Sequence, residues 1–358
     1  MLFITNDGTI INTDSTNLYY NKILQFKTEW ESGKETFEIN TSGSTGIPKK
    51  IQLSRNQLIA SAKLTQKAFN LNEGDTAFCC LNVEYIAGMM MLVRAFEIGM
   101  DLMVVEPNSN PFEGIEKHLF MLQRNTFYAF VPLQIENILN NENLARNLNS
   151  AKAIIIGGAS INAQIQEKVQ NLSTPIYATY GMTETVTHIA IKRLNGDLKQ
   201  DYFEVLPNVK IDTDERNCLR IFSETTNNEW ITTNDLVEIV EENKFILLGR
   251  VDNIINSGGV KIQLEKVDSI IGQNLNKIQF NKRFFSFGIA NEKLGQKLVL
   301  VVENESEMEF GTDIYENLTK FEHPKQLFFV NKFIETPTGK IDKIKTVNEY
   351  ILNQIPNS

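Results

Sequence analysis

The residues best suited to chemistry form a short polar loop near the start of the chain. Hydroxyl side chains and two glycines follow one another over Thr41, Ser42, Gly43, Ser44, Thr45 and Gly46, and Lys49 comes shortly after. Backbone N–H groups in such a loop can surround an anion, the hydroxyls add donors, and Lys49 adds positive charge. No Gly-Lys-Ser/Thr closes the stretch, so it predicts a phosphate loop that differs from the P-loop.

The flanks of this loop weigh against a plain surface turn, which is the commoner structure for a Ser/Thr/Gly cluster. Residues 37–39 lead into the loop as a predicted strand, and residues 51–53 leave it as another. Ser54 and Gln57 then have the spacing of a capping box, which predicts the start of a helix. The loop is therefore expected between regular elements, which favours a binding role.

A second stretch, residues 180–184, combines an aromatic ring with polar groups. Gly181 separates Tyr180 from Thr183 and Glu184. Such a turn could stack a flat ring on Tyr180 and hold a metal ion with Glu184. Taken alone, a glycine turn with a surface glutamate is the commoner structure.

Three later stretches place charged groups at turns. Asp235 ends a predicted strand, where it could bind sugar hydroxyls or sit in an ordinary turn. Residues 249–253 and 257–262 form a charged, glycine-rich junction that would serve as a hinge or as a plain linker. Lys340 stands in a tight Pro-Thr-Gly turn before a predicted helix, where an exposed surface lysine is the alternative.

The composition predicts a soluble globular protein and excludes several functions. The chain has 358 residues, enough for two or more domains, and its net charge of −9 gives no electrostatic reason to bind nucleic acid or an anionic membrane. Cys79, Cys80 and Cys218 form neither a disulfide framework nor a metal motif, which predicts buried packing for the adjacent pair and a reducing cytoplasm. The N-terminus has no signal pattern, and the longest apolar run, 85–93, is too short for a bilayer.

Strands separated by helices predict an α/β fold with a doubly wound, mainly parallel sheet. The expected strands are 76–83, 101–106, 127–131 and 151–156. The expected helices are one within residues 1–36 and then 54–71, 87–98, 113–124, 134–148 and 163–172. Shorter strands over 202–248 predict a β-rich subdomain. Beyond it, strands at 284–290, 297–303 and 327–333 with helices at 263–275, 313–321 and the C-terminus predict a compact α+β domain. We therefore expect two domains, 1–249 and 250–358.

Together and in this order, the five stretches resemble the AMP-forming adenylate ligases, which include acyl- and aryl-CoA synthetases, luciferases and peptide-synthetase adenylation domains. The resemblance runs from about Glu38 to Lys343, most of the chain. It implies a large ATP- and acyl-binding domain and a small mobile domain that carries a catalytic lysine. It also implies two steps, in which a carboxylic acid and ATP with Mg²⁺ form an acyl-adenylate and the acyl group then passes to CoA.

The resemblance implies a role for residues in each stretch. Lys340, Thr183 and Glu184 would be catalytic, with Glu184 also the Mg²⁺ ligand. The ATP-binding residues would be Thr41, Ser42, Gly43, Ser44, Thr45, Gly46, Lys49, Gly158, Ala159, Tyr180, Gly181, Asp235 and Arg250. The substrate pocket would contain Tyr85, Arg94, Gly157, Met182 and His188. Asp252 and Asn253 would form the hinge, and Gly258, Gly259 and Lys261 would lie on a loop that faces CoA.

The sequence departs from the family's pattern in three places. The phosphate loop begins at residue 41, whereas most members carry a long N-terminal subdomain before it. Asn234 replaces the usual glycine before Asp235. Where relatives often have a histidine-containing segment, this chain has residues 85–89 and then Arg94, which could face a second substrate carboxylate or be structural or solvated.

The short form and the two segments around Arg94 and Tyr180 look most like bacterial o-succinylbenzoate–CoA ligases of menaquinone biosynthesis. That resemblance implies an aryl acid with two carboxylates and a cytoplasmic enzyme whose partners are small molecules, with no nucleic acid and no membrane. A homodimer is one possible oligomeric state. One alternative is an adenylating enzyme for another aryl acid that loads CoA or a carrier protein. Another is a non-catalytic nucleotide-binding remnant, against which Glu184 and Lys340 argue. A serine hydrolase is set aside because no Gly-x-Ser-x-Gly elbow occurs.

Overall fold

The computed structural model describes residues 1–40, 50–122, 125–159, 161–280, 282–336 and 340–352. Within these residues, thirteen strands form the largest sheet. They are β1 (Leu2–Ile4), β2 (Ile10–Asn12), β5 (Thr76–Cys79), β6 (Asp101–Val104), β7 (Thr126–Phe130), β8 (Ala153–Ile156), β9 (Ile176–Gly181), β10 (His188–Arg193), β11 (Phe203–Val205), β12 (Lys210–Thr213), β13 (Cys218–Phe222), β14 (Trp230–Glu241) and β15 (Lys244–Arg250). Their order across the sheet is β12-β13-β14-β15-β11-β10-β9-β8-β7-β5-β6-β1-β2.

The centre of this sheet is parallel and its two ends are antiparallel. Strands β6, β5, β7, β8 and β9 pair in parallel, in that order. From β9 onward, β10, β11, β15, β14, β13 and β12 pair antiparallel. The predicted α/β fold class is confirmed, and the predicted β-rich region is hydrogen-bonded to the parallel centre as one continuous sheet. The carboxyl ends of β5, β7, β8 and β9 therefore meet at one edge, where ligands bind in such sheets.

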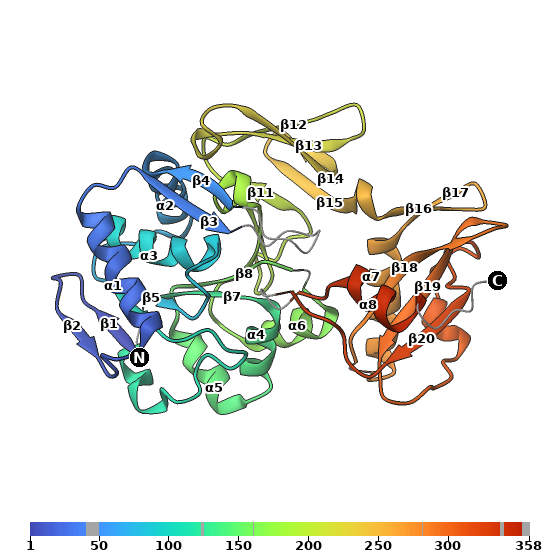
Figure 1. Cartoon of the computed structure of the whole chain (residues 1–358), viewed down its shortest axis with the longest axis horizontal. Helices are drawn as coiled ribbons and strands as arrows, with labels where there is room; N and C mark the ends of the chain where they lie inside the picture. Colours follow the sequence, from blue (N-terminus) through green and yellow to red (C-terminus); the bar gives the residue numbers. More distant parts are fainter. Residues whose placement is uncertain (41–49, 123–124, 160, 281, 337–339, 353–358) are drawn as a thin grey trace.

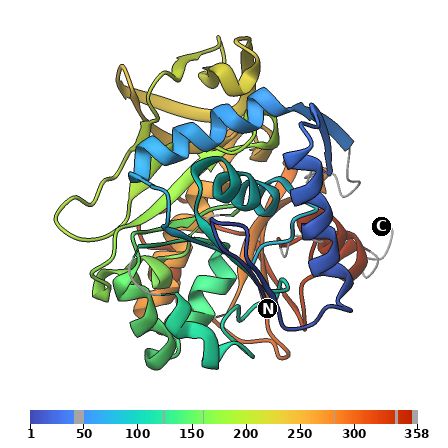
Figure 2. The same cartoon turned by 90° about the vertical axis from the view of Figure 1, so that its left-hand side faces the viewer.

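Helices cover both faces of the parallel centre (Figures 1 and 2). On one side lie α1 (Leu18–Glu31), α2 (Arg55–Phe69) and α3 (Ile86–Ile98), and on the other lie α4 (Pro132–Leu139), α5 (Glu142–Arg146) and α6 (Ala163–Lys168). Successive side chains of β5 serve the two sides, because Cys79 packs with Ile23 of α1 whereas Phe78 packs with Ile135 of α4. Burial on both faces explains why these strands are continuously apolar.

The residues after β15 build a second sheet, which lies to one side of the first in Figure 1. Its strands are β16 (Ile254–Ser257), β17 (Val260–Gln263), β18 (Phe284–Asn291), β19 (Gly295–Glu303) and β20 (Gln326–Val330), with α7 (Leu264–Lys277) and α8 (Lys343–Tyr350). Val267 of α7 packs on one side of β19 with Leu300, and Val347 of α8 packs on the other with Val301. We call residues 254–352 the C-terminal unit. Helix α7 contacts both α6 and β15 of the large sheet.

Several predicted elements are confirmed in detail. Ser54 caps α2, because its backbone N–H donates to the Gln57 side chain at 3.0 Å and its hydroxyl accepts from the Gln57 backbone N–H at 3.3 Å. Gly99 ends α3 in the left-handed conformation, with φ +76°. Cys79 and Cys80 are both buried and free, as predicted.

Other predicted elements are wrong in extent. The predicted helix 113–124 is only a 3₁₀ turn, η1 (Glu116–Met121), because Gly114 at its start adopts φ +77°. The predicted helix 134–148 breaks before α5, since the Asn141 side chain accepts from two backbone N–H groups and caps a new helix there. The predicted helix 313–321 is reduced to η7 (Thr312–Tyr315), and Asn317 beyond it has φ +69°. The predicted strand 76–83 stops at Cys79.

Candidate active site

The predicted phosphate loop, 41–49, lies outside the described residues, but its two ends are fixed. It joins β3 (Thr36–Asn40) to β4 (Lys50–Ser54), an antiparallel pair in which Asn40 lies opposite Lys50. Asn40 also forms a β-bridge with Tyr85, the residue before α3. Asn40, the last described residue before this stretch, therefore lies beside Tyr85, a predicted residue of the substrate pocket.

The turn after β8 requires glycine at Gly157 and favours it at Gly158. A Cβ on Gly157 would lie 2.4 Å from the hydroxyl of Thr179 on the neighbouring strand β9. Gly158 has φ +86°, and Ala159 after it is exposed. The turn therefore packs closely on β9 on one side and presents its backbone to solvent on the other. Because neither glycine has a side chain, a ligand could approach the backbone of this turn closely.

Three predicted ATP-binding residues meet at the end of β9. The hydroxyl of Tyr180 donates to Asp235 Oδ2 at 2.6 Å, and Nη1 of Arg250 donates to Asp235 Oδ1 at 2.8 Å. Asp235 and Arg250 are direct partners across β14 and β15. The trio is brought together from positions 180, 235 and 250, which only the fold can do.

The ring of Tyr180 is more enclosed than its predicted stacking role suggests. Its residue is 7% exposed, and its ring lies 5.2 Å from that of Phe245 and 5.9 Å from that of Phe203, centroid to centroid. Burial, followed by the charge of Asp235, raises the pKa of the Tyr180 hydroxyl well above its ordinary value. The hydroxyl therefore stays protonated and acts as a donor.

A tight turn presents Glu184 next to this trio. A Cβ on Gly181 would lie 2.2 Å from the backbone oxygen of Thr187, so only glycine fits there. The hydroxyl of Thr185 accepts from the Met182 N–H at 3.0 Å and donates to Thr187 O at 2.8 Å, which closes the turn η4 (Thr183–Thr185). Thr183 is half-buried, and the carboxylate of Glu184 is exposed.

Metal binding at this turn would rest on one carboxylate. Among the described residues, no group of three or more His, Cys, Asp or Glu could hold a metal ion. Magnesium commonly binds proteins through one or two carboxylates and takes its other ligands from substrate phosphates and water. A single exposed carboxylate such as that of Glu184 fits that pattern.

Arg94 is a buried cation held by neutral partners. Its residue is 2% exposed, Nε donates to Thr65 Oγ1 at 3.1 Å, and Nη2 donates to Thr187 Oγ1 at 3.1 Å. No acidic residue of the described chain forms an ion pair with it. Burial lowers its pKa to about 9. The alternative of a solvated arginine is therefore excluded. Thr187 connects the guanidinium to the turn that carries Glu184, because its backbone oxygen accepts from Thr185 in that turn.

His188 lies in the same buried layer. Its Nε2 is 3.4 Å from the Thr65 hydroxyl, and its ring packs edge-on against Phe69. Burial, with the positive charge of Arg94, lowers the pKa of His188 well below its ordinary value. The ring is therefore neutral at physiological pH, and it contacts Thr65, which is also a partner of Arg94.

The predicted hinge residues are bonded both to the large sheet and to helix α7. Asp252 lies in η6 (Val251–Asn253), where it accepts from Arg250 Nη2 at 2.9 Å and from Asn234 Nδ2 at 3.1 Å. Asn253 Nδ2 donates to Glu265 of α7 at 2.5 Å. The junction is therefore fastened to the large sheet on one side and to the C-terminal unit on the other.

The remaining predicted residues lie in the C-terminal unit. Gly258 and Gly259 form the turn of the β16–β17 hairpin, with φ +61° and +84°, and Lys261 beyond them is exposed. Lys340 is half-buried, and burial lowers its pKa below the ordinary value. In Figure 1 the segments on either side of residues 337–339 extend from this unit toward the large sheet.

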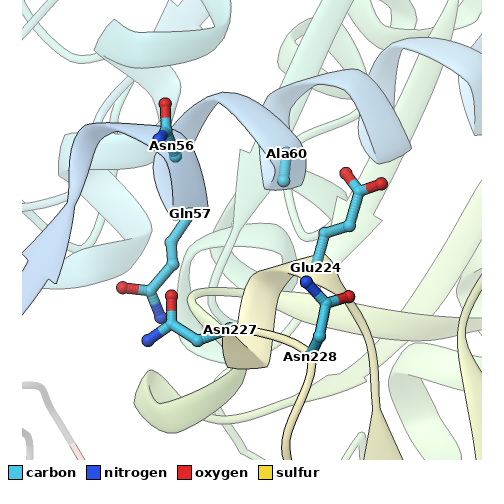
Figure 3. Close-up of a pocket in the computed structure, with 6 residues that line it drawn as sticks. All are labelled: Asn56, Gln57, Ala60, Glu224, Asn227 and Asn228. Carbon is cyan, nitrogen blue, oxygen red and sulfur yellow. The ribbon is translucent and has the colours of Figure 1, made fainter.

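A separate polar pocket of about 330 Å³ lies where α2 faces the 3₁₀ turn η5 (Glu224–Thr226). Figure 3 shows its six lining residues, which are Asn56, Gln57 and Ala60 on the helix and Glu224, Asn227 and Asn228 on the facing turn. None of the predicted site residues lines this pocket. It is therefore distinct from the cluster around Tyr180.

The sequence reasoning missed the partners of the charged groups. Thr65 and Thr187 hold Arg94, Glu265 holds Asn253, and Phe203 with Phe245 encloses Tyr180. All of these contacts join distant positions, and single threonines or phenylalanines carry no local motif. Only pairing of strands and packing of helices could have revealed them.

Comparison with known proteins places the chain in a family. Residues 25–215, more than half of the chain, match the AMP-binding enzyme family. The chain therefore belongs to the AMP-binding enzymes. A solved acyl-CoA synthetase (AMP-forming)/AMP-acid ligase II-like protein from Dyadobacter fermentans is 40% identical, with a TM-score of 0.63 over 95% of this chain and 96% of that one.

More distant relatives bear more specific names. The 2-succinylbenzoate–CoA ligase of Escherichia coli is 27% identical over 300 residues, which are 79% of this chain and 62% of that enzyme. The chain thus spans less than two thirds of that relative. A solved O-succinylbenzoate coenzyme A synthetase from Bacillus subtilis, in complex with ATP and magnesium, shares the fold with a TM-score of 0.70 at 20% identity, over 86% of this chain and 69% of that one.

None of the described helices combines the length and the apolarity needed to cross a membrane.

Proposed function

We propose that this chain is an AMP-forming acid–thiol ligase. The observation that carries the proposal is the meeting of Tyr180, Asp235 and Arg250 at the edge of the sheet where the glycine turns of β8 and β9 also end. Hydroxyl and carboxylate groups suit a ribose, and open glycine backbone suits a flat base and phosphates. Membership of the AMP-binding family supports the same ligand.

In this proposal three groups of residues bind the base, the ribose and the phosphates of the nucleotide. Gly158, Ala159 and Tyr180 lie along the base, Asp235 and Arg250 bind the ribose, and residues 41–49 bind the β- and γ-phosphates. Glu184 is placed to hold a Mg²⁺ ion together with phosphate oxygens, and the bound ion would offset phosphate charge. Thr183 would contact the α-phosphate or the acyl carboxylate with its hydroxyl.

The proposed chemistry has two steps. The substrate carboxylate attacks the α-phosphorus of ATP, and pyrophosphate leaves as an acyl-adenylate forms. Lys340 offsets the negative charge that gathers between the two anions, which is where a cation lowers the barrier most. The thiol of CoA then attacks the acyl carbon, and AMP leaves.

We further propose that the chain works as two domains, 1–249 and 250–358. Lys340 serves the first step, and rotation at Asp252 and Asn253 would bring the Gly258–Gly259 turn and Lys261 to the site for the second. The bonds from η6 to Asn234 of β14 and to Glu265 of α7 are those that such a rotation must exchange.

For the acid we propose o-succinylbenzoate, which has an aromatic ring and two carboxylates, for menaquinone biosynthesis in the cytoplasm. Arg94 supports a substrate with a second negative charge, because it is a buried cation whose described partners are neutral hydroxyls. Tyr85, Gly157 and Met182 would line the rest of the pocket, while His188 supports it from behind. The names of the relatives agree with this choice.

The test is ATP–pyrophosphate exchange with a panel of carboxylic acids that includes o-succinylbenzoate. The proposal expects exchange with o-succinylbenzoate, lost in Lys340→Ala but not in Lys277→Ala, a control lysine whose side chain is 61% exposed. Exchange with a different aryl acid would support the proposed ligase activity but contradict o-succinylbenzoate as the substrate. ATP binding without exchange for any acid would favour the non-catalytic remnant.

Transfer to the thiol separates the remaining alternative. The acyl-adenylate formed in the first assay is offered CoA, and thioester formation is followed by mass spectrometry. We expect an acyl-CoA product and release of AMP. An adenylate that resists CoA, yet is formed by the enzyme, would favour a carrier protein as the acyl acceptor.

A further inference from the structure

A cluster of three charged side chains stands at the base of the segment that carries Lys340. Arg283 precedes β18, Glu303 ends β19, and Glu335 lies five residues before the lysine. The guanidinium donates to Glu303 through Nε at 2.7 Å and Nη2 at 2.6 Å, and to Glu335 through Nη1 at 2.6 Å. All three of its nitrogens are therefore used, and one cation joins two carboxylates.

Glu303 also accepts a hydrogen bond from the backbone of the segment that leads to Lys340. Its Oε1 accepts the N–H of Phe333 at 2.7 Å, and the Phe333 ring packs under the guanidinium of Arg283, 5.6 Å from it. Burial raises the pKa of Glu303, but the bonds from Arg283 and Phe333 outweigh it, so the pKa lies below its ordinary value. The carboxylate is therefore charged whenever the protein is folded near neutral pH.

The clamped residues are paired directly with Lys340. Residues 334–336 and 340–342 form two arms, in which Thr336 N–H donates to Lys340 O at 2.7 Å and Asp342 N–H donates to Ile334 O at 2.8 Å. Glu335 and Ile341 form an antiparallel bridge between the arms. A shift of Glu335 would thus move Lys340 through the backbone.

The geometry distinguishes this cluster from an ordinary surface ion pair. The side chains of Glu303, Glu335 and Arg283 are 16%, 33% and 37% exposed, and the contact to Glu303 is a two-bond fork. Exposed single pairs contribute little, whereas bidentate arginine contacts fix direction as well as distance. The exposed pair Lys277–Glu316, with one contact at 3.1 Å, is the matched counterexample in the same unit.

We infer that Arg283 and Glu335 are positioning residues for Lys340, which set where its ammonium group stands during acyl-adenylate formation. Neither residue touches a reacting atom in this inference; both act through the arm 334–336. The inference rests on the proposed function, in which Lys340 serves the first step and not the second. It therefore predicts a loss confined to one half-reaction.

The experiment compares Glu335→Ala, Arg283→Ala and the control Glu316→Ala. The probe acid is whichever panel member gives wild-type exchange. We expect both clamp variants to lower the kcat of ATP–pyrophosphate exchange by about 10- to 100-fold, because small displacements of a catalytic group are costly. The KM for ATP and the rate at which supplied acyl-adenylate reacts with CoA should stay within roughly twofold of wild type, as should every rate of Glu316→Ala.

Glu335→Gln provides the conservative rescue, since its amide oxygen can still accept from Arg283, and it should regain part of the lost exchange. An equal loss in both half-reactions would show that the cluster merely supports folding and would overturn the inference. A rate of ATP–pyrophosphate exchange that stays unchanged in Glu335→Ala and Arg283→Ala would overturn the inference as well.

A failure of the proposed function gives a different pattern, namely no wild-type exchange with any acid. The anchoring is then decided by hydrogen exchange of the amides of Thr336, Lys340 and Asp342. Hydrogen exchange of these amides that is faster than wild type in Glu335→Ala, but unchanged in Glu316→Ala, supports a clamp on this segment. Equal exchange in the two variants would refute it.

Discussion

The hydroxyl of Tyr180 donates to the carboxylate of Asp235 at 2.6 Å, although three strands separate β9 from β14 in the sheet. Neighbouring strands lie about 4.8 Å apart, so a flat sheet would hold these two strands roughly 19 Å from each other. The antiparallel end of the sheet must therefore curl back over the end of β9. This curl creates the concave corner in which Arg250 completes the trio.

Removing the Tyr180 hydroxyl tests that corner. We expect Tyr180→Phe to lower the free energy of unfolding by about 1–2 kcal/mol and to weaken ATP binding several-fold, because Asp235 loses one of its two side-chain donors. Calorimetric ATP titration and chemical denaturation measure the two effects. Tyr177→Phe on the same strand, whose hydroxyl accepts from Arg193 instead, should leave ATP affinity unchanged; equal affinities for all three proteins would speak against the trio.

Arg94→Met separates a functional arginine from a structural one. Burial of this cation among neutral hydroxyls costs free energy, as its pKa of about 9 indicates, so the variant should unfold at the same or a higher temperature. The gain would be about 0–2 kcal/mol, while exchange with a dicarboxylic aryl acid should fall more than exchange with its monocarboxylic analogue. A strongly destabilised Arg94→Met with an unchanged acid preference would make the residue structural.

The pH dependence of stability should contain a contribution from His188. Its folded pKa lies below the unfolded value of 6.5, so below pH 6.5 the unfolded chain binds a proton that the folded chain refuses. The free energy of unfolding therefore falls as pH decreases, by up to about 1.4 kcal/mol per pH unit. His188→Gln should flatten this decrease between pH 6.5 and 5 in denaturation experiments, and His118→Gln serves as the control. Parallel curves for wild type and His188→Gln would contradict the assignment.

Substitution of Gly249, at the junction of the two sheets, by any residue with a side chain should destabilise the protein. It has φ +148°, and a Cβ there would lie 2.2 Å from Gln263 Nε2 and 2.9 Å from Glu265 Oε2. We expect Gly249→Ala to cost about 2–3 kcal/mol and to disturb the bond from Gln263 to Leu248 O.

Two comparisons divide this cost into strain and collision. Gly259→Ala meets no atom within 4 Å at φ +84°, so its smaller loss in thermal unfolding reports backbone strain alone. Adding Gln263→Ala to Gly249→Ala should recover part of the difference, and the double-mutant cycle gives the coupling. Additive effects of the two substitutions would exclude the collision.

Local signals in the sequence predicted the elements that depend on neighbours in the chain. The capping pair Ser54 and Gln57 and the terminal Gly99 fixed two helices nearly to the residue. The helices predicted at 113–124 and 313–321 failed because left-handed residues, Gly114 and Asn317, interrupt an apolar pattern that otherwise reads as helical. The short β1 and β2 were missed because each has three residues and because β1, which links β2 to the sheet, pairs with β6 about a hundred residues away.

For the site, motifs predicted which residues matter but not how they are held. Tyr180, Asp235 and Arg250 were singled out separately, and the curl of the sheet is what makes them one cluster. The environment of Arg94 could not be read from its segment, since Thr65 and Thr187 come from α2 and from the turn before β10. Burial of a charge is a property of the whole packing arrangement.

The position of β1 in the large sheet has a consequence for synthesis on the ribosome. One antiparallel partner of β1, β2, is made directly after it, but the other, β6, begins at Asp101 and in turn pairs with β5, so residues 2–4 are made long before their place in the large sheet exists. At typical rates of about 5–20 residues per second, β1 waits roughly 5–20 seconds with the edge that faces β6 unpaired. The nascent chain, rather than the finished protein, is therefore the form most exposed to aggregation and to chaperones.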